Sequence, residues 1–163
     1  MSGGLPTTID PVQLAERGAR LNGTLAVDGM ARLSQSGVGP LGTVEVDLRF
    51  ERSETARLYR AEGQVRAILQ VPCQRCLERM ALSLDIQPHW LFVRAGAQHG
   101  STPSHESDVI AVDRPLSLRE LVEDELLLAL PMVPMHDLAD CPARQFVTRS
   151  AQPDDAASDA DKE

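Results

Sequence analysis

Residues 43–51 have the sequence Thr-Val-Glu-Val-Asp-Leu-Arg-Phe-Glu. Apolar and polar side chains alternate throughout this stretch. Because successive side chains of a strand point to opposite faces, the stretch predicts a strand with one buried face and one solvated face. Strands of this kind are typical of antiparallel sheets. The nine residues therefore predict an antiparallel sheet that turns one face towards a core.

The same alternation recurs further along the chain. Residues 65–71 and 80–86 both alternate, and the second stretch continues towards Trp90 and Phe92. We expect these two strands to flank a turn within residues 72–79. Weaker strand patterns cover residues 21–27 and 108–112. These strands predict one antiparallel sheet, which is either open or closed into a barrel-like form.

The strongest helix signal begins at Ser117. The residues Ser117 to Glu120 form a capping box, and an apolar stripe follows until Pro131, where the missing N–H of proline ends the pattern. This predicts a helix over about 117–130. Short helices are expected at 11–17, after an Asp-Pro start signal, and at about 29–35. The predicted fold class is α+β, with the helix at 117–130 packed on the sheet.

The chain of 163 residues is long enough for a single core. We expect one domain over residues 1–142, interrupted by a mobile loop at 96–107 that is rich in Gly, Ser, Pro and His. Residues 143–163 are expected to form a disordered acidic tail, because few apolar side chains and a high charge do not support a core.

The net charge of −8 is unevenly distributed. Residues 1–116 hold 13 acidic residues and 12 arginines, whereas residues 151–163 hold five acidic residues and one lysine. The body of the domain is therefore close to neutral. The overall acidity does not exclude a role near RNA, and it suits basic proteins as partners.

No signal peptide or membrane-spanning segment is expected. The longest apolar run, residues 126–134, is too short to cross a bilayer and contains Pro131. The three cysteines cannot all pair within one chain, which favours a reducing compartment. We therefore predict a cytoplasmic protein without a membrane partner.

Residues 73–76, Cys-Gln-Arg-Cys, lie between two predicted strands. Two thiols at this spacing in a hairpin turn can both reach one metal ion, as in zinc knuckles. His136 and Cys141 follow the predicted helix and would complete a tetrahedral set. Cys73, Cys76, His136 and Cys141 are thus candidate ligands of one structural zinc ion.

Two other interpretations of these cysteines remain open. A thioredoxin-like redox pair requires the motif at the start of a helix, whereas the residues after Cys76 alternate like a strand. Alternatively, the cysteines are small core residues and His136 is an ordinary loop residue. Glycine-rich phosphate loops, Gly-x-Ser-x-Gly and His-Glu-x-x-His are all missing from the sequence, so no catalytic residues and no small-molecule substrate are predicted.

The acidic helix and the neighbouring arginines are the candidate partner contacts. Carboxylates on the helix can meet a basic protein, but they can equally form an ordinary solvated face. Arginines beside the Cys-x-x-Cys motif can pair with RNA phosphate, although ordinary surface charge also accounts for them. The candidates are Arg75, Arg79, Glu120, Glu123, Asp124 and Glu125.

Two blocks of the sequence resemble a known family. Residues 71–78, Val-Pro-Cys-Gln-Arg-Cys-Leu-Glu, and residues 121–136, Leu-Val-Glu-Asp-Glu-Leu-Leu-Leu-Ala-Leu-Pro-Met-Val-Pro-Met-His, followed by Cys141, are similar to the YceD family of large ribosomal RNA subunit accumulation proteins. The resemblance covers about residues 5–142. It implies a role in the synthesis, processing or stability of 23S ribosomal RNA and supplies no catalytic residues.

The sequence and the resemblance together predict a non-enzymatic accessory factor. Its expected partners are a pre-ribosomal particle, a ribosomal protein or an assembly factor, with direct ribosomal RNA contact as a further option. The rival functions are an RNA-binding or RNA-processing enzyme and a thiol oxidoreductase that uses Cys73 and Cys76.

Overall fold

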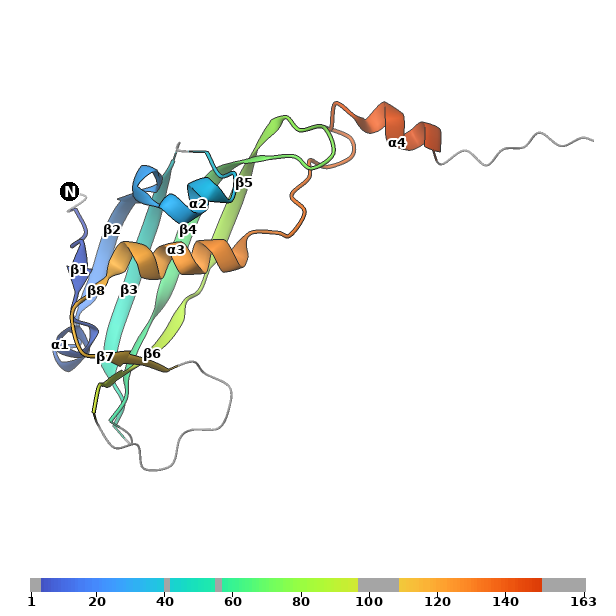
Figure 1. The fold of residues 1–163 in the computed structure, drawn as a ribbon. Helices are drawn as coiled ribbons and strands as arrows, with labels where there is room; N and C mark the ends of the chain where they lie inside the picture. Colours follow the sequence, from blue (N-terminus) through green and yellow to red (C-terminus); the bar gives the residue numbers. More distant parts are fainter. Residues whose placement is uncertain (1–3, 40–41, 55–56, 97–108, 151–163) are drawn as a thin grey trace, which may run out of the picture.

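The computed structural model describes residues 4–39, 42–54, 57–96 and 109–150. The strands are β1 (Thr8–Ile9), β2 (Arg20–Ala26), β3 (Thr43–Arg52), β4 (Tyr59–Pro72), β5 (Arg79–Ile86), β6 (His89–Arg94), β7 (Val109–Val112) and β8 (Leu116–Ser117). The helices are α1 (Pro11–Glu16), α2 (Ala31–Gln35), α3 (Leu118–Ala129) and α4 (Arg144–Ser150), with one 3-10 turn at Val27–Gly29. Helices α2 and α3 lie against one face of a large sheet (Figure 1), which confirms the α+β class.

The large sheet has six strands and is open. Five strands follow the order β2-β3-β4-β6-β7. The sixth, β5, pairs with β4 along a different stretch from β6. No pairing among the described strands joins β2 to β5 or β7, so the barrel-like alternative is wrong. Helices cover the apolar face, and the sheet therefore does not need to close on itself to bury it. The pairings are antiparallel except for β6 with β7, which run parallel.

Strand β4 is longer than its alternating pattern predicts and has two partners on one edge. Residues 65–72 pair with β5, and residues 59–62 pair with β6. The predicted continuous strand from 80 to 92 is thus two strands, separated at Gln87 and Pro88. Proline has no N–H to donate to a ladder, so it marks this break between partners.

The alternating pattern at 43–51 is confirmed by the burial of its side chains. Val44, Val46, Leu48 and Phe50 are all buried, and the side chains between them are not. Gly63 of β4 lies opposite Leu48. A Cβ atom at Gly63 would lie 1.9 Å from the carbonyl oxygen of Asp47, so only glycine allows the two strands to approach as they do.

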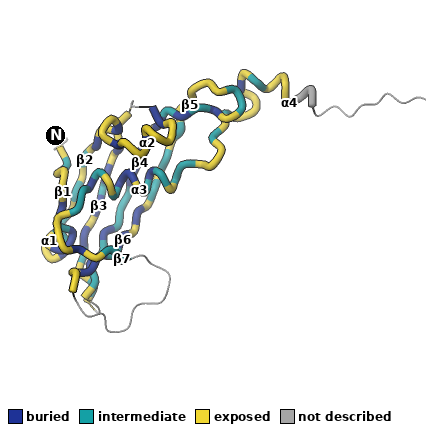
Figure 2. Tube along the Cα trace, in the orientation of Figure 1, coloured by how far each residue is buried: buried dark blue, intermediate teal, exposed yellow. Residues whose placement is uncertain are grey.

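Helix α3 lies across the apolar face of the sheet (Figure 1). The Ser117 hydroxyl accepts a hydrogen bond from the Glu120 N–H at 3.3 Å, as the capping box predicts. Leu118, Val122 and Leu126 form the buried stripe and face the core. Figure 2 shows this burial alternating with exposed positions along the helix. The small sheet of β1 and β8 holds the start of α3 next to the N-terminal segment.

The short helix α2 is capped by a residue of α3. Met30 occupies its N-cap position and makes no side-chain cap hydrogen bond. Instead, Oε1 of Glu123 accepts hydrogen bonds from the N–H groups of Arg32 (2.7 Å) and Leu33 (3.0 Å). Only 4% of Glu123 is exposed. This carboxylate joins two helices far apart in sequence.

The expected tail at 143–163 and the expected loop at 96–107 are only partly covered by the described residues. The segment from 143 onwards begins with α4, which was not predicted, and residues 151–163 of the expected tail lie outside the described residues. The expected mobile loop also lies outside them, apart from Gly96. Within the described part of the chain, no helix has the length and apolar character needed to cross a membrane.

Candidate metal centre

The Cys-x-x-Cys motif forms the turn between β4 and β5. The Cys73 N–H donates to the carbonyl of Glu78, and the Leu77 N–H donates to the carbonyl of Cys73, both at 2.8 Å. These two bonds close a compact turn around the thiols. Leu77 has a φ of 63°, in the left-handed region that normally favours glycine. The motif therefore lies in a hairpin turn and not at the start of a helix.

The segment after α3 folds back onto this turn. The helix stops before Pro131, and the chain then runs to the β4–β5 hairpin (Figure 1). The Gln74 N–H donates to the carbonyl of Pro134 at 2.8 Å, and the His136 N–H points at Sγ of Cys73 at 3.5 Å. One bond between main-chain groups and one from a main-chain N–H to a cysteine sulfur thus hold the loop to the turn.

All four predicted ligands meet at this junction. One ligand atom each from Cys73, Cys76, His136 and Cys141 lies within 4.8 Å of every other. Sγ of Cys76 is 3.4 Å from Nδ1 of His136. Two donors on one tetrahedral zinc ion are about 3.5–3.8 Å apart, given Zn–S and Zn–N bonds of about 2.3 and 2.0 Å. The cluster therefore has about the dimensions of a zinc site.

The surroundings of Cys73 favour a thiolate. Burial opposes ionisation of its thiol. The backbone N–H groups of Cys76, His136 and Arg75, assisted by the Cys76 side chain, outweigh burial and lower the pKa of Cys73 to about 5. By contrast, burial raises the pKa of Cys76, and the neighbouring sulfurs of Cys73 and Cys141 add to this rise. A divalent cation would displace the remaining thiol protons.

The donor set fits a structural metal ion better than a catalytic one. Three thiolates and one imidazole are the soft donors that zinc prefers, and N–H groups directed at a ligating sulfur are its usual outer-shell partners. Cys73 and Cys141 are buried, and the other two residues are partly buried. Four protein ligands fill a tetrahedral site and leave no position for a substrate.

The acidic residues of α3 have different environments. Glu120 and Asp124 are exposed, and Asp124 pairs with Arg32 of α2. Glu125 accepts a hydrogen bond from Nε1 of Trp90 at 2.7 Å. Glu123 is buried in its capping role, so we leave it out of the proposed contact surface. The sequence did not predict that Glu123 caps α2. A usable signal was Met30 at the N-cap of α2, because its side chain cannot accept a hydrogen bond from the helix N–H groups.

The two candidate arginines lie beside the turn. Nη1 of Arg79 is 3.4 Å from the carbonyl oxygen of Gln70 and 3.5 Å from that of Gly37. Nη2 of Arg75 lies 3.6 Å from Sδ of Met135, while its Nη1 is buried without a hydrogen-bond partner. Both guanidinium groups are thus directed mainly at the protein itself.

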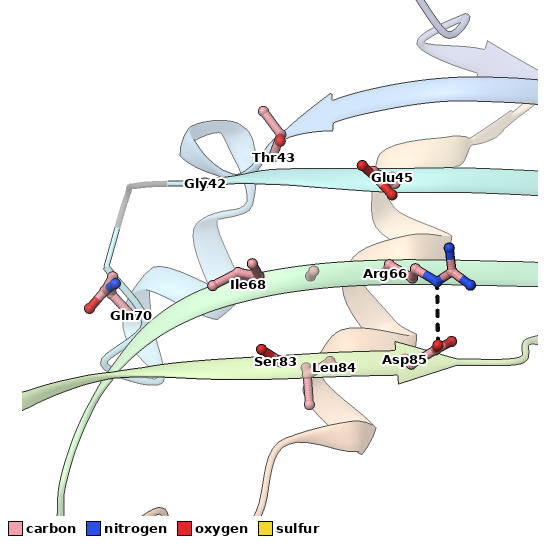
Figure 3. Close-up of a pocket in the computed structure, with 10 residues that line it drawn as sticks. Gly42, Thr43, Glu45, Arg66, Ile68, Gln70, Ser83, Leu84 and Asp85 are labelled. Carbon is pink, nitrogen blue, oxygen red and sulfur yellow. Dashed lines mark hydrogen bonds and ion pairs between the residues drawn. The ribbon is translucent and has the colours of Figure 1, made fainter. Parts of the chain in front are cut away.

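The outer face of the sheet carries several other arginines. Arg49 and Arg60 both pair with Glu51, at 2.8 Å each. A shallow groove of about 640 Å³ on this face crosses β3, β4 and β5 (Figure 3), and Arg66 pairs with Asp85 at its rim. The ten residues that line the groove include no cysteine or histidine. Paired charges of this kind attract phosphate only weakly.

Comparisons with known proteins agree with the two-block resemblance. The family model described as "Large ribosomal RNA subunit accumulation protein YceD" matches residues 61–163, which include all four candidate ligands. A Haemophilus influenzae protein with the same description is 33% identical over 138 residues, covering 84% of this chain and 79% of the relative. No solved structure matches the chain. The chain therefore belongs to the YceD family of large ribosomal RNA subunit accumulation proteins.

Proposed function

We propose that the protein is a non-enzymatic accessory factor for the accumulation of 23S ribosomal RNA. The support is its family membership and the description of its Haemophilus influenzae relative. The protein would act in the cytoplasm by binding a pre-ribosomal particle, through a ribosomal protein or an assembly factor. The exposed carboxylates of α3 suit a basic partner. Direct RNA contact through Arg75 and Arg79 is the weaker option, because both guanidinium groups are directed mainly at the protein itself.

We further propose that one structural zinc ion joins the β4–β5 turn to the segment after α3. The observation that carries this is the convergence of two ligand pairs that are separated by 59 residues between Cys76 and His136. Without the metal, only a few hydrogen bonds hold the loop to the turn. With it, the end of α3 and the hairpin would form one rigid unit.

The structure offers less support to the rival functions. A redox pair gains reactivity from a helix N-terminus, and here the motif lies between two strands. An RNA-processing enzyme requires convergent carboxylates or an activated nucleophile. In the described residues, the carboxylates of the outer sheet face are engaged largely in ion pairs with arginine.

Depletion of the protein in its own host tests the functional proposal. We expect 23S ribosomal RNA to fall relative to 16S ribosomal RNA, and the wild-type chain to restore it. Equal loss of both RNAs would contradict the proposal. Cleavage of a precursor RNA by the purified chain, abolished by a single carboxylate substitution, would favour the enzyme instead.

Metal analysis tests the zinc proposal independently. The chain is purified without a metal-affinity tag, and about one zinc ion per chain is expected. A matched variant, Ser83→Ala on the outer face of the sheet, should bind the same amount. A zinc content near zero, together with stability that chelator does not alter, would refute the site.

A further inference from the structure

Exposed apolar side chains gather around the candidate metal centre. Among the described residues, Ile68 is the sole large apolar side chain exposed on the outer sheet face. The others lie on the β4–β5 turn, on α3 and after it. Four of them define what we call the loop patch: Met132 (99% exposed), Val133 (57%), Met135 (44%) and Leu138 (45%). Grouped exposure of this kind marks an interaction surface more often than scattered exposure does.

The loop patch borders a hollow. A pocket of about 410 Å³ lies between β5 and the loop, with Met80 and Leu82 on the strand side and Val133, Met135 and Leu138 on the loop side. A side chain from another molecule can enter a hollow of this size. Methionine side chains adapt to different shapes, which suits a surface that accepts an inserted anchor.

The charged residues near the patch indicate which class of partner it would bind. Residues 120–141 hold six carboxylates and no lysine or arginine, and four of the six are exposed: Glu120, Asp124, Asp137 and Asp140. Asp137 lines the pocket and takes part in no ion pair among the described residues. Two cations lie near the patch: Arg75 lines the pocket with Nη1 buried and Nη2 3.6 Å from Sδ of Met135, and Nη1 of Arg144 donates to the carbonyl of Ala139 at 3.0 Å. The exposed carboxylates of residues 120–141 outnumber these two arginines, so the surface favours a positively charged partner over phosphate.

The backbone of Leu77 supplies an independent observation. This side chain is 74% exposed and its residue has a φ of 63°. A leucine in this conformation costs about 1 kcal/mol relative to glycine. The hydrogen bonds that close the turn account for this backbone conformation, whereas burial does not account for the leucine side chain. Strained, exposed residues cluster at binding sites, and Leu77 lies on the same turn that the loop is bonded to.

We propose that the loop patch binds a positively charged protein segment that inserts an apolar side chain between β5 and residues 131–138. The apolar contact supplies affinity, and the exposed carboxylates within residues 120–141 orient the basic segment. This inference rests on the proposed function, because a large-subunit assembly factor meets mainly basic proteins and RNA. Bonds between the loop and the turn hold the patch in place before binding, which lowers the entropic cost.

The test uses the full chain as purified and two kinds of probe. The first is a set of individually purified basic proteins of the large ribosomal subunit, and the second is protein-free 23S ribosomal RNA. Kd is measured by biolayer interferometry at low and high salt. The double variant Met132→Ser, Val133→Ser removes two exposed apolar side chains, and Ile68→Ser is the matched control.

We expect at least one basic protein to bind, with affinity that falls as salt rises. The double variant should weaken this binding by about tenfold or more, and the control should change it by less than about twofold. The inference is overturned if no basic protein binds, if the double variant binds equally well, or if only RNA binds. A wild-type dimer that the double variant converts to a monomer would also overturn it, because a second copy would then cover the patch.

A cellular measurement separates this inference from the proposed function. Both variants are expressed in depleted cells and 23S ribosomal RNA is measured. If depletion lowers 23S RNA and the double variant restores it fully, the patch inference fails while the function stands. If depletion leaves 23S RNA unchanged, the function fails, and the binding experiment still judges the patch. If the double variant does not restore 23S RNA while the Ile68→Ser control does, the result supports the inference.

Discussion

Replacing Glu123 by alanine is expected to destabilise the fold strongly, although the helix that contains it also carries exposed carboxylates. Its carboxylate accepts hydrogen bonds from the N–H groups of Arg32 and Leu33 and a further one from Nε of Arg32 at 3.3 Å. Alanine cannot accept these bonds. Two N–H groups at the start of α2 would then be left without a partner beneath α3.

The magnitude follows from the groups left unpaired. Loss of an N-cap oxygen costs about 0.5–2 kcal/mol, and each buried donor without a partner costs about 1–3 kcal/mol. These ranges describe overlapping effects, so we expect a loss of about 2–4 kcal/mol in the free energy of unfolding. Glu123→Gln keeps one acceptor oxygen in place. It should cost about 1 kcal/mol, because the lost charge faces Arg32, whose side chain is 46% exposed.

The assay is urea denaturation at neutral pH, with the slope of the transition compared between variants. Asp124→Ala is the matched control, since Asp124 is the next residue and pairs with the same Arg32, but its side chain is 53% exposed. An exposed pair of this kind contributes less than about 1 kcal/mol. If Glu123→Ala and Asp124→Ala differ by less than about 0.5 kcal/mol, the capping argument is refuted.

Three further predictions concern the turn, the sheet and the metal. Cys141→Ser should bind far less zinc, and chelator should lower the melting temperature of the wild type but not of this variant; equal chelator sensitivity would contradict the site. Leu77→Gly should raise the unfolding free energy by up to about 1 kcal/mol by relieving the left-handed conformation, whereas Leu77→Ala should not. Gly63→Ala should cost about 1–3 kcal/mol, because its Cβ would meet the carbonyl of Asp47. Gly4→Ala, where the added atom meets open space, is its control, and equal stability of the two variants would refute this reasoning.

Local patterns predicted most of the secondary structure because each depends on near neighbours. Alternation located β3, and the capping box with Pro131 located α3 within a residue at each end. Errors arose where a neighbour in space decided the outcome. The stretch after residue 80 became two strands, because β4 offers one edge to both β5 and β6.

At the candidate site, too, local sequence patterns predicted one part and contacts between distant segments decided the rest. The spacing of the cysteines and His136 pointed to the four candidate ligands that the fold brings together, since metal ligands must be specific residue types. The sequence did not distinguish a metal site from buried cysteines, because the two pairs are 59 residues apart between Cys76 and His136 and only folding brings them together. The exposure of the loop patch likewise had no clear pattern in the sequence.

The sequence by itself determined the fold class, the principal strands and helices, and the residues able to hold a metal, because backbone periodicity and side-chain chemistry are local properties. Tertiary structure decided that the sheet stays open, that Glu123 is buried as a cap for another helix, and that the loop patch faces solvent. Each of these depends on which surfaces meet. Two carboxylates such as Glu123 and Asp124, adjacent in the chain, can therefore have opposite environments.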